Sequence, residues 1–325
     1  MLFNPRTVQL SLIEEDQTFR IRTEYDVEGL AASMQRVGLV NHPVLKAQSG
    51  TFQIISGFRR IQAARALQWE HVPARVVAAE QSFQSNCLLA IVDNSTHGIL
   101  NVVEEARAIA LLSRTVSNPA ELIVLARDAG IRVNKAMIAK LQKVLEMPLT
   151  FQKGLINGRI ALPVALKLFS LIDSPSTSLS DPEGAHILAE LLLELNLSLN
   201  RQRELLDWVE AIIHRDAISM TELLSEDPLV HWRHADKIDR AHKSQKIREY
   251  VKYRRFPEIS RVQDRFATTL KQLALPPGIR MIPPPFFEGQ IFSLQVDFKN
   301  QRDLIRLRDE IDRIGRSPLL NSLLD

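Results

Sequence analysis

The sequence predicts an α+β chain that is mostly helical, with sheet-forming segments near its two ends. Short apolar segments alternate with helically spaced ones through residues 1–100, whereas helical spacing alone runs from 101 to 172. Near the end, residues 278–298 ("GIRMIPPPFFEGQIFSLQVDF") are typical of two strands joined by a Pro-rich turn. We therefore expect an N-terminal α/β domain over 1–100, a helical bundle over 101–172 and a small α/β unit over 271–325.

Composition excludes several kinds of site. The 325 residues are 45% hydrophobic and 24% charged, which is ordinary for a soluble protein with sizeable cores. A net charge of +3 and a pI near 9.0 lean basic, so an anionic partner needs a local basic patch. Cys87 is the single cysteine, which excludes an internal disulfide and a Cys-rich zinc site. No leader-like or membrane-length apolar run occurs, so we expect a cytoplasmic protein without a membrane partner.

Each element of the first hundred residues has its own signal. In the first strand, Val8, Leu10 and Leu12 share one face. Helical spacing from Val27 predicts a helix that ends at Gly38. The remaining elements follow in order: strands over 43–46 and 52–55, a helix over 58–67, a strand over 72–77 and a helix that includes 83–91.

A helix, a glycine turn and a second helix form the centre of the chain. Asn118 is a typical N-cap for a helix that ends at Gly130, and Asn134 is a typical N-cap for the next one. Helix-turn-helix DNA readers have this layout, and so do plain helical hairpins, so the pattern leaves both interpretations open. Residues 173–184 ("DSPSTSLSDPEG") form the clearest linker, and a further helical region is expected over 185–270.

Two features of the C-terminal half bear on partners. The basic stretch, residues 237–261, carries nine Lys or Arg against three acids, which fits either a solvated helix face or phosphate contacts. The terminal strands and helix bury too little core alone. A second copy of the chain is therefore expected to cover the apolar face of Leu304, Leu307 and Ile311, the alternative being that this face docks onto the chain's own helical domain.

The segment "TFQIISGFRRIQAARAL", residues 51–67, places two arginines at the start of a helix. Cations are disfavoured there, because a helix N-terminus already presents partial positive charge and unpaired N–H groups. Arg59 and Arg60, two and three residues after Gly57, therefore predict an anion pocket with forked donors suited to phosphate oxygens. The structural alternative is that one of them pairs with Asp93 or Glu104.

Several motifs resemble those of the ParB family of chromosome and plasmid partition proteins. "SGFRRIQAARALQWEHVPARVV" is similar to the signature G-E-R-R-x-x-A-A…G…x-I-P-V-x-V. "FRIRTEYDVEGLAASMQRVGLVNHPVL" resembles the family's Q-P-R-x-x-F opening, helix and G-x-x-x-P. "DNSTHGILNVVEEARAIALL" stands where the family has E-N-x-Q-R-x-x-L-x-x-x-E-E-A, and "MPLTFQKGLINGRIALPVALKLFSL" resembles its L-P…G-x-L…H-A segment. The resemblance runs in order from residue 6 to 172.

The resemblance implies a homodimer that binds a specific double-stranded DNA element through the central helix-turn-helix and acts at the nucleoid. It also implies an N-terminal domain that binds CTP with Mg²⁺, hydrolyses it slowly and closes into a clamp. Carried over by position, Gly57, Arg59 and Arg60 contact the triphosphate and Arg22 matches the opening arginine. The residues that match the metal-associated motif are Asp93, in place of a glutamate, and Asn94, which is expected to contact Mg²⁺.

The sequence also departs from the family pattern. Phe58 replaces the glutamate of G-E-R-R that assists turnover, so the chain is at most a slow CTPase. Thr96 and His97 replace a Gln-Arg pair, and the turn between Gly130 and Ile138 is about two residues longer than usual. Only "MLFNPR" precedes the first strand, where partition ParB proteins carry a basic arm for a ParA-type ATPase, so that partner is not expected to be engaged through such an arm.

The expected DNA contacts surround the second helix of the helix-turn-helix: Arg132, Asn134, Lys135, Lys140 and Lys143. The first interpretation is thus a ParB-like, sequence-specific DNA-binding protein of chromosome or plasmid partition with a CTP-type pocket. The first alternative is a ParB-like regulator or accessory protein without nucleotide turnover. The second is a nuclease or small-molecule enzyme on the same scaffold, against which the helical DNA-binding half argues.

Overall fold

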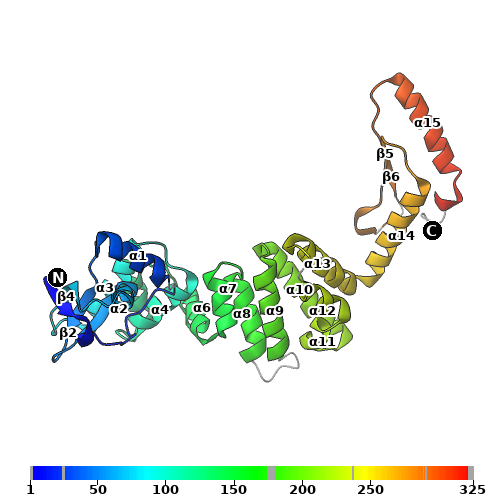
Figure 1. Cartoon of the computed structure of the whole chain (residues 1–325). Coiled ribbons are helices and arrows are strands. Elements are labelled where there is room, and N and C mark those ends of the chain that lie inside the picture. Colours follow the sequence, from blue (N-terminus) through cyan, green and yellow to red (C-terminus); the bar gives the residue numbers. More distant parts are fainter. Residues whose placement is uncertain are drawn as a thin grey trace. The chain divides into compact units, whose positions relative to one another are not determined.

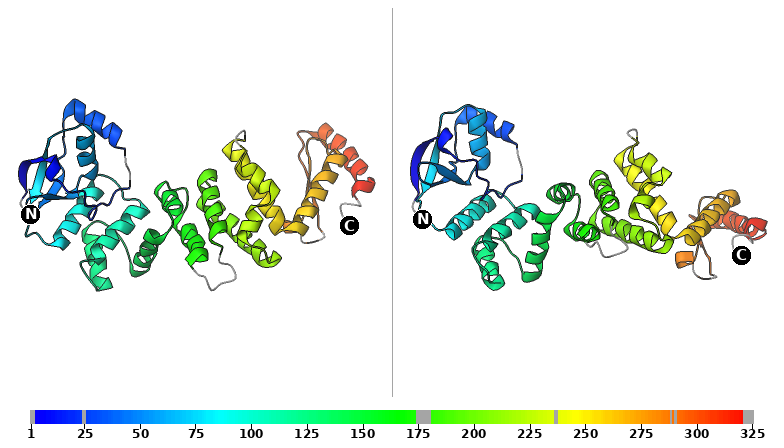
Figure 2. Two further views of the ribbon diagram at one scale, coloured as in Figure 1. Left: turned by 60° about the horizontal axis from the view of Figure 1, so that its bottom comes forward. Right: turned by 90° about the horizontal axis from the view of Figure 1, so that it is seen from below.

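The computed structural model describes residues 3–23, 26–173, 181–235, 238–287, 289 and 291–320. The chain divides into two compact units, Met1–Arg203 and Glu204–Asp325. Figures 1 and 2 show the four N-terminal strands together with the first helices around them. The chain is mostly helical with a small mixed sheet near its N-terminus, which confirms the predicted fold class. In the described part, no helix is long and apolar enough to cross a membrane.

The sheet of the first unit has the strand order β1-β4-β2-β3. Its strands are β1 (Asn4–Gln9), β2 (Val44–Ala47), β3 (Phe52–Ser56) and β4 (His71–Val77). β4 pairs antiparallel with β1 and parallel with β2, and β2 pairs antiparallel with β3. Alternate side chains of β4 are buried, as the period of a half-covered strand requires. The sheet therefore holds the end of β3, where the candidate site begins, at an edge.

One prediction for the first strand is wrong. β1 ends at Gln9, and Leu10–Leu12 form a single 3₁₀ turn in which Ile13 N donates to Leu10 O at 3.2 Å. This turn spaces inward-facing side chains three residues apart instead of two. Leu10 and Ile13 consequently enter the core, whereas Leu12 is 39% exposed.

Three helices complete the N-terminal part: α1 (Val27–Val37), α2 (Phe58–Ala66) and α3 (Phe83–Thr96). Asp26 caps α1 by accepting from Gly29 N. Gly38 ends α1 at a φ of 75°, as the sequence predicts. α1 packs against α2, and α3 packs against β3. The shared core contains Met34, Ile61 and the inner side chains of the sheet.

The rest of the first unit is a helical bundle. Its helices are α4 (Val102–Ser113), α5 (Pro119–Asp128), α6 (Lys135–Glu146), α7 (Leu149–Ile156), α8 (Leu162–Asp173) and α9 (Pro182–Leu195). α4 packs against α3, α5, α6 and α7 and so connects the sheet domain to the bundle. α9 packs against α7 and α8, so this compact unit continues beyond the predicted linker 173–184, of which 174–180 lie outside the described residues.

In the second unit, helices precede a small hairpin. After α10 (Leu199–Asp216), which spans the division between the units, come α11 (Met220–Leu224), α12 (Asp227–Arg233), α13 (Arg240–Arg255), α14 (Pro257–Leu273), β5 (Ile279–Ile282), β6 (Ser293–Val296) and α15 (Gln301–Gly315). Figure 1 shows α15 beside the two strands. The expected second-copy cover for Leu307 is wrong, because this side chain is fully buried with Ile279 and Ile314 of its own chain. Leu304 remains 39% exposed.

Several cations of the basic stretch have partners within the unit. Arg248 bonds Glu204 at 2.5 Å, and Arg254 bonds Glu226 at 2.6 Å. Lys237 lies outside the described residues. Arg248 and Arg254 are therefore not part of a purely solvated helix face, because each forms an ion pair with a residue of another helix or turn.

Candidate functional site

A cavity of about 460 Å³ opens where β3 ends, α2 begins and α3 ends. Its lining includes four arginines, Arg20, Arg22, Arg59 and Arg60, and among the described lining residues a single carboxylate, that of Asp93. Cationic groups thus outnumber anionic ones in a concave site with backbone N–H groups at a helix start. Such a site favours a ligand with several negative charges.

Gly57 joins β3 to α2 in a conformation that other residues resist. Its φ is 94°, in the left-handed region, and it is the N-cap of α2 without any capping side chain. A Cβ at this position would lie 2.8 Å from Pro43 Cβ and 2.9 Å from Pro43 Cα. The sharp turn therefore needs glycine, and it leaves the first-turn N–H groups of α2 without a capping side chain beside the cavity.

Arg59 and Arg60, in the first turn of α2, both line the cavity. Arg59 Nη2 donates to Asp26 O at 2.8 Å, and Arg60 Nη1 donates to His42 O at 3.2 Å. Neither bond neutralises a charge, because both acceptors are main-chain carbonyls. Arg59 Nε is buried and has no hydrogen-bond partner in the described part of the structure. An anion in the cavity is the ordinary partner for such a donor.

Asp93 and Glu104, the alternative partners, are bound elsewhere. Asp93 accepts from Ser56 Oγ at 2.5 Å and pairs with Arg75 at 3.3 Å. Burial lowers the pKa of the Arg60 guanidinium, the charge of Asp93 opposes this shift, and the charge of Arg75 adds to it. Asp93 thus partly balances the charge of Arg60 while it bonds Ser56 and Arg75.

Arg22 lines the cavity and also ties three segments together. Its guanidinium donates to the carbonyls of Asn94 at 2.7 Å and Gly98 at 2.8 Å, at the end of α3. It also pairs with Glu104 at 3.0 Å, and the Glu104 side chain is 1% exposed. Glu104 completes a capping box with Asn101 at the start of α4. Arg22 consequently holds the junction of α3 and α4 against the wall of the cavity.

The oxygen ligands that the cavity offers, from Asp93 and Asn94, suit a metal ion that is also bound by phosphate oxygens better than one held by the protein alone. Asn94 Nδ2 donates to Ala90 O at 2.7 Å, which leaves the amide oxygen as the group for a ligand. In the described part of the chain, no cluster of three or more His, Cys, Asp or Glu could hold a metal. Mg²⁺ typically takes one or two protein carboxylates plus phosphate oxygens, so Asp93 and Asn94 fit a metal that arrives with a triphosphate.

Sequence reasoning missed part of the lining. Arg20, Ser56 and His97 all face the cavity. His97 Nδ1 donates to Asp93 O at 2.5 Å, which holds the ring at the end of α3. Ser56 was detectable from its place beside Gly57, whereas Arg20 stands two residues before the motif arginine, Arg22, and has no motif role of its own. Only the fold brings Arg20 to the site.

The expected DNA-reading segment has the predicted local structure. Gly130 ends α5 at a φ of 87°, and Asn134 Oδ1 accepts from Met137 N at 2.8 Å to cap α6. Ile138, Leu141 and Val144 bury one side of α6. The residues expected to contact DNA are all exposed: Arg132, Asn134 and the three α6 lysines, Lys135, Lys140 and Lys143.

The α6 lysines form one face. With about 100° of rotation per residue, they span roughly 140° of the helix surface on the side opposite the buried stripe. Asn134 uses its side-chain oxygen to cap the helix, so its structural role is established by geometry. The three lysines therefore present a basic face of α6 to solvent.

The sheet domain matches a family model. Residues 4–94 match the ParB N-terminal domain. Among curated relatives, a nucleoid occlusion protein of Shouchella clausii is 25% identical over 189 residues, covering 57% of this chain and 62% of the relative. A probable plasmid-partitioning protein ParB of Thermus thermophilus is 29% identical over 130 residues, covering 38% of this chain and 43% of the relative.

Solved structures add a comparison of folds. The C-terminally truncated chromosome-partitioning protein ParB of Caulobacter crescentus, complexed to the centromeric parS site, has a TM-score of 0.34 and 21% identity, covering 62% of this chain and 97% of that one. The match to the Shouchella clausii protein spans less than two thirds of that relative's length. Residues 4–94 therefore match a ParB N-terminal domain, and the similarity to the Shouchella clausii nucleoid occlusion protein, over 189 residues, is longer than that domain.

Proposed function

We propose that this protein is a ParB-like, sequence-specific DNA-binding protein whose N-terminal cavity binds CTP. The observation that carries the proposal is the cavity itself, in which four arginines and the start of α2 surround the space beside Gly57. Such a site suits three linked phosphates, because forked guanidinium donors and backbone N–H groups both bind phosphate oxygens.

The nucleotide is tested by calorimetry with CTP and ATP in the presence of Mg²⁺. We expect CTP to bind more tightly than ATP, and Arg59→Ala with Arg60→Ala to abolish binding. Arg36→Ala is the matched control, because Arg36 is an exposed arginine of the same unit whose Nε donates to Ala32 O within α1. No heat with any nucleotide in the unmodified protein would refute the CTP proposal.

Turnover is expected to be slow or absent. Phe58 lies in the cavity wall at the family's glutamate position, and a phenyl ring cannot accept a proton from water. Asp93 is the carboxylate left for that task, but it already bonds Ser56 and Arg75. Bound Mg²⁺ would supply charge neutralisation at the phosphates, with Asp93 and Asn94 as its protein ligands. Brisk phosphate release from CTP would contradict this assignment.

The DNA partner is proposed to contact the exposed face of α6. Lysines in such a face bind backbone phosphates, and affinity should fall steeply as salt rises. Genome-wide crosslinking identifies the sites. One sharp peak is the outcome expected for partition and nucleoid association, whereas scattered promoter peaks favour the regulator alternative. The relatives' names, nucleoid occlusion and plasmid partitioning, support a chromosomal or plasmid target without choosing between them.

We propose that the chain dimerises through its C-terminal hairpin and helix, which comprise β5, β6 and α15. Their own core is small, and large apolar side chains remain on their surface: Leu294 (38% exposed), Phe298 (53%), Leu304 (39%) and Ile305 (48%). A second copy would remove them from water. Deleting residues 276–325 should convert a dimer into a monomer in sedimentation. A truncated protein that stays dimeric would place the interface elsewhere.

A further inference from the structure

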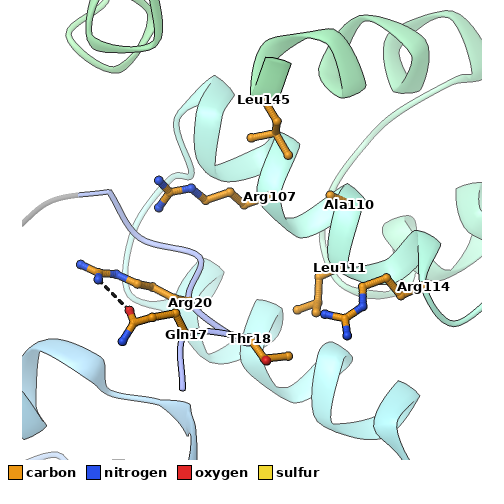
Figure 3. Close-up of a pocket in the computed structure, with 8 residues that line it drawn as sticks. All are labelled: Gln17, Thr18, Arg20, Arg107, Ala110, Leu111, Arg114 and Leu145. Carbon is orange, nitrogen blue, oxygen red and sulfur yellow. Dashed lines mark hydrogen bonds between the residues drawn. The ribbon is translucent and has the colours of Figure 1, made fainter. Parts of the chain in front are cut away.

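Cavities outside the proposed CTP site differ in what lines them. The cavity of the first unit drawn in Figure 3, of about 410 Å³, shares Arg20 with the cavity proposed to bind CTP, so it adjoins the site already described. A cavity of about 400 Å³ in the second unit shares no lining residue with that site. It lies between α12, α13 and α14, where α13 packs against both of the other helices. Its chemistry is therefore independent of the nucleotide proposed above.

Three aromatic side chains line the cavity of the second unit: Trp232, Tyr250 and Tyr253. The rings of Trp232 and Tyr250 meet edge to face, with their centroids 5.8 Å apart. The Tyr250 hydroxyl donates to Glu226 Oε2 at 2.5 Å, and burial together with this bond raises the pKa of Tyr250 to about 12. Tyr253 is 40% exposed. Protein contacts thus hold the first two rings, whereas Tyr253 keeps ring surface for a ligand.

Helix α14 contributes hydrogen-bonding groups to the same cavity. Ser260 lines it and is only 8% exposed, yet its hydroxyl has no hydrogen-bond partner in the described part of the structure. Buried polar groups ordinarily have a partner, so this hydroxyl points to a ligand. Gln263 and Asp264 follow three and four residues later, which places them on the same face of α14 as Ser260.

Two lysines of the basic stretch, Lys246 and Lys252, also line the cavity. Unlike the ion-paired arginines of that stretch, they have no carboxylate partner among the residues that the structure describes. The lining carboxylates are Glu249, whose Oε1 accepts from Gln245 Nε2 at 2.8 Å, and Asp264. Lysines suit phosphate oxygens, and a carboxylate suits the amino group of a base such as cytosine. An aromatic ring, cations and acceptors for a base edge therefore meet in one cavity.

We propose that this cavity binds single-stranded nucleic acid. A base stacks on Tyr253, its edge bonds Ser260 and Asp264, and Lys246 and Lys252 bind the adjoining phosphates. Base stacking on aromatic side chains beside cationic groups is the usual basis of single-strand binding. Duplex DNA keeps its bases stacked within the helix and so cannot place one on Tyr253. The site is therefore distinct from the α6 face proposed for duplex DNA.

The probe is a fluorescein-labelled strand of ten deoxycytidines, titrated with the full chain and followed by fluorescence anisotropy. We expect saturable binding that persists when excess unlabelled duplex DNA is added. Tyr253→Ala should weaken it by about fivefold to a hundredfold, whereas Tyr253→Phe, which keeps the ring, should preserve it. Lys252→Ala should weaken binding and reduce its salt dependence. Lys271→Ala is the matched control, because Lys271 is an exposed lysine of α14 outside the cavity.

A strand of ten cytidine ribonucleotides distinguishes RNA from DNA as the source of the base. Binding of either strand that depends on Tyr253 supports the proposal, and the tighter of the two identifies the source. Thermal unfolding checks that Tyr253→Ala is folded, and Lys252→Ala decides the case if it is not, since Lys252 is exposed.

Three results would overturn the proposal. They are the absence of saturable binding of both strands, binding that Tyr253→Ala and Lys252→Ala leave unchanged, and binding that excess duplex DNA abolishes, which would assign the strand to α6. Because the cavity lies in the second unit, none of these results depends on whether the first unit binds CTP.

Discussion

Replacing Gly57 by alanine tests whether the turn before α2 builds the cavity that we propose binds CTP. The φ of 94° costs a residue with a Cβ about 1–2 kcal/mol. The added Cβ would also lie 2.8 Å from Pro43 Cβ and 2.9 Å from Pro43 Cα. Pro43 has a fixed ring, so the backbone must shift, at a further cost of about 1–3 kcal/mol. We expect a total loss of about 2–5 kcal/mol in the free energy of unfolding.

Gly50→Ala provides the control for backbone strain alone. Gly50 has a φ of 89°, and no heavy atom lies within 4 Å of the position its Cβ would take. It should therefore lose only about 1–2 kcal/mol. Urea unfolding of both variants measures the difference, and calorimetry with CTP should show weaker binding for Gly57→Ala only. Equal destabilisation of the two variants would refute the reasoning about the contact with Pro43.

Three further predictions concern the Arg22–Glu104 ion pair, the buried Cys87 thiol and the α6 lysines. Glu104→Ala should cost about 3–5 kcal/mol in thermal unfolding, because it leaves the Arg22 guanidinium without its charge partner at a buried junction. Burial raises the pKa of the Cys87 thiol to about 11. At pH 8 the native protein should therefore react slowly with an aromatic disulfide reagent and the unfolded protein rapidly. A fast reaction of the native protein would contradict the burial of Cys87. Replacing the three α6 lysines by alanine should reduce the slope of log affinity for DNA against log salt by up to about 3, because each phosphate contact contributes about 0.9 to that slope. An unchanged slope would place the DNA-binding face elsewhere.

Local signals were sufficient for most helices and for part of the site. The limits of α1 and the caps Asp26 and Asn134 involve residues within one helical turn of each other, so the sequence contains the interacting partners side by side. The strand–glycine–helix sequence at Gly57 likewise predicts the anion-binding geometry, because the backbone conformation itself directs N–H groups to the cavity.

Contacts between distant segments required the fold. Arg22 and Glu104 are far apart in sequence, and no periodicity connects them. The error at Leu12 arose because one 3₁₀ turn changes which side chain faces inward, and the error at Leu307 arose because the hairpin of β5 and β6 folds back onto α15. Both depend on where another segment of the chain lies.

The sequence by itself determined the mostly helical α+β class, the turn at Gly57 and the basic face of α6, since each depends on side-chain order and spacing along one element. Only the tertiary structure decided which charges are neutralised. In the folded chain Asp93 pairs with Arg75 and Glu104 pairs with Arg22, whereas Arg59 lines an open cavity. Electrostatic pairing depends on distances of a few ångströms between segments that the chain order does not fix, so it emerges only when the elements pack.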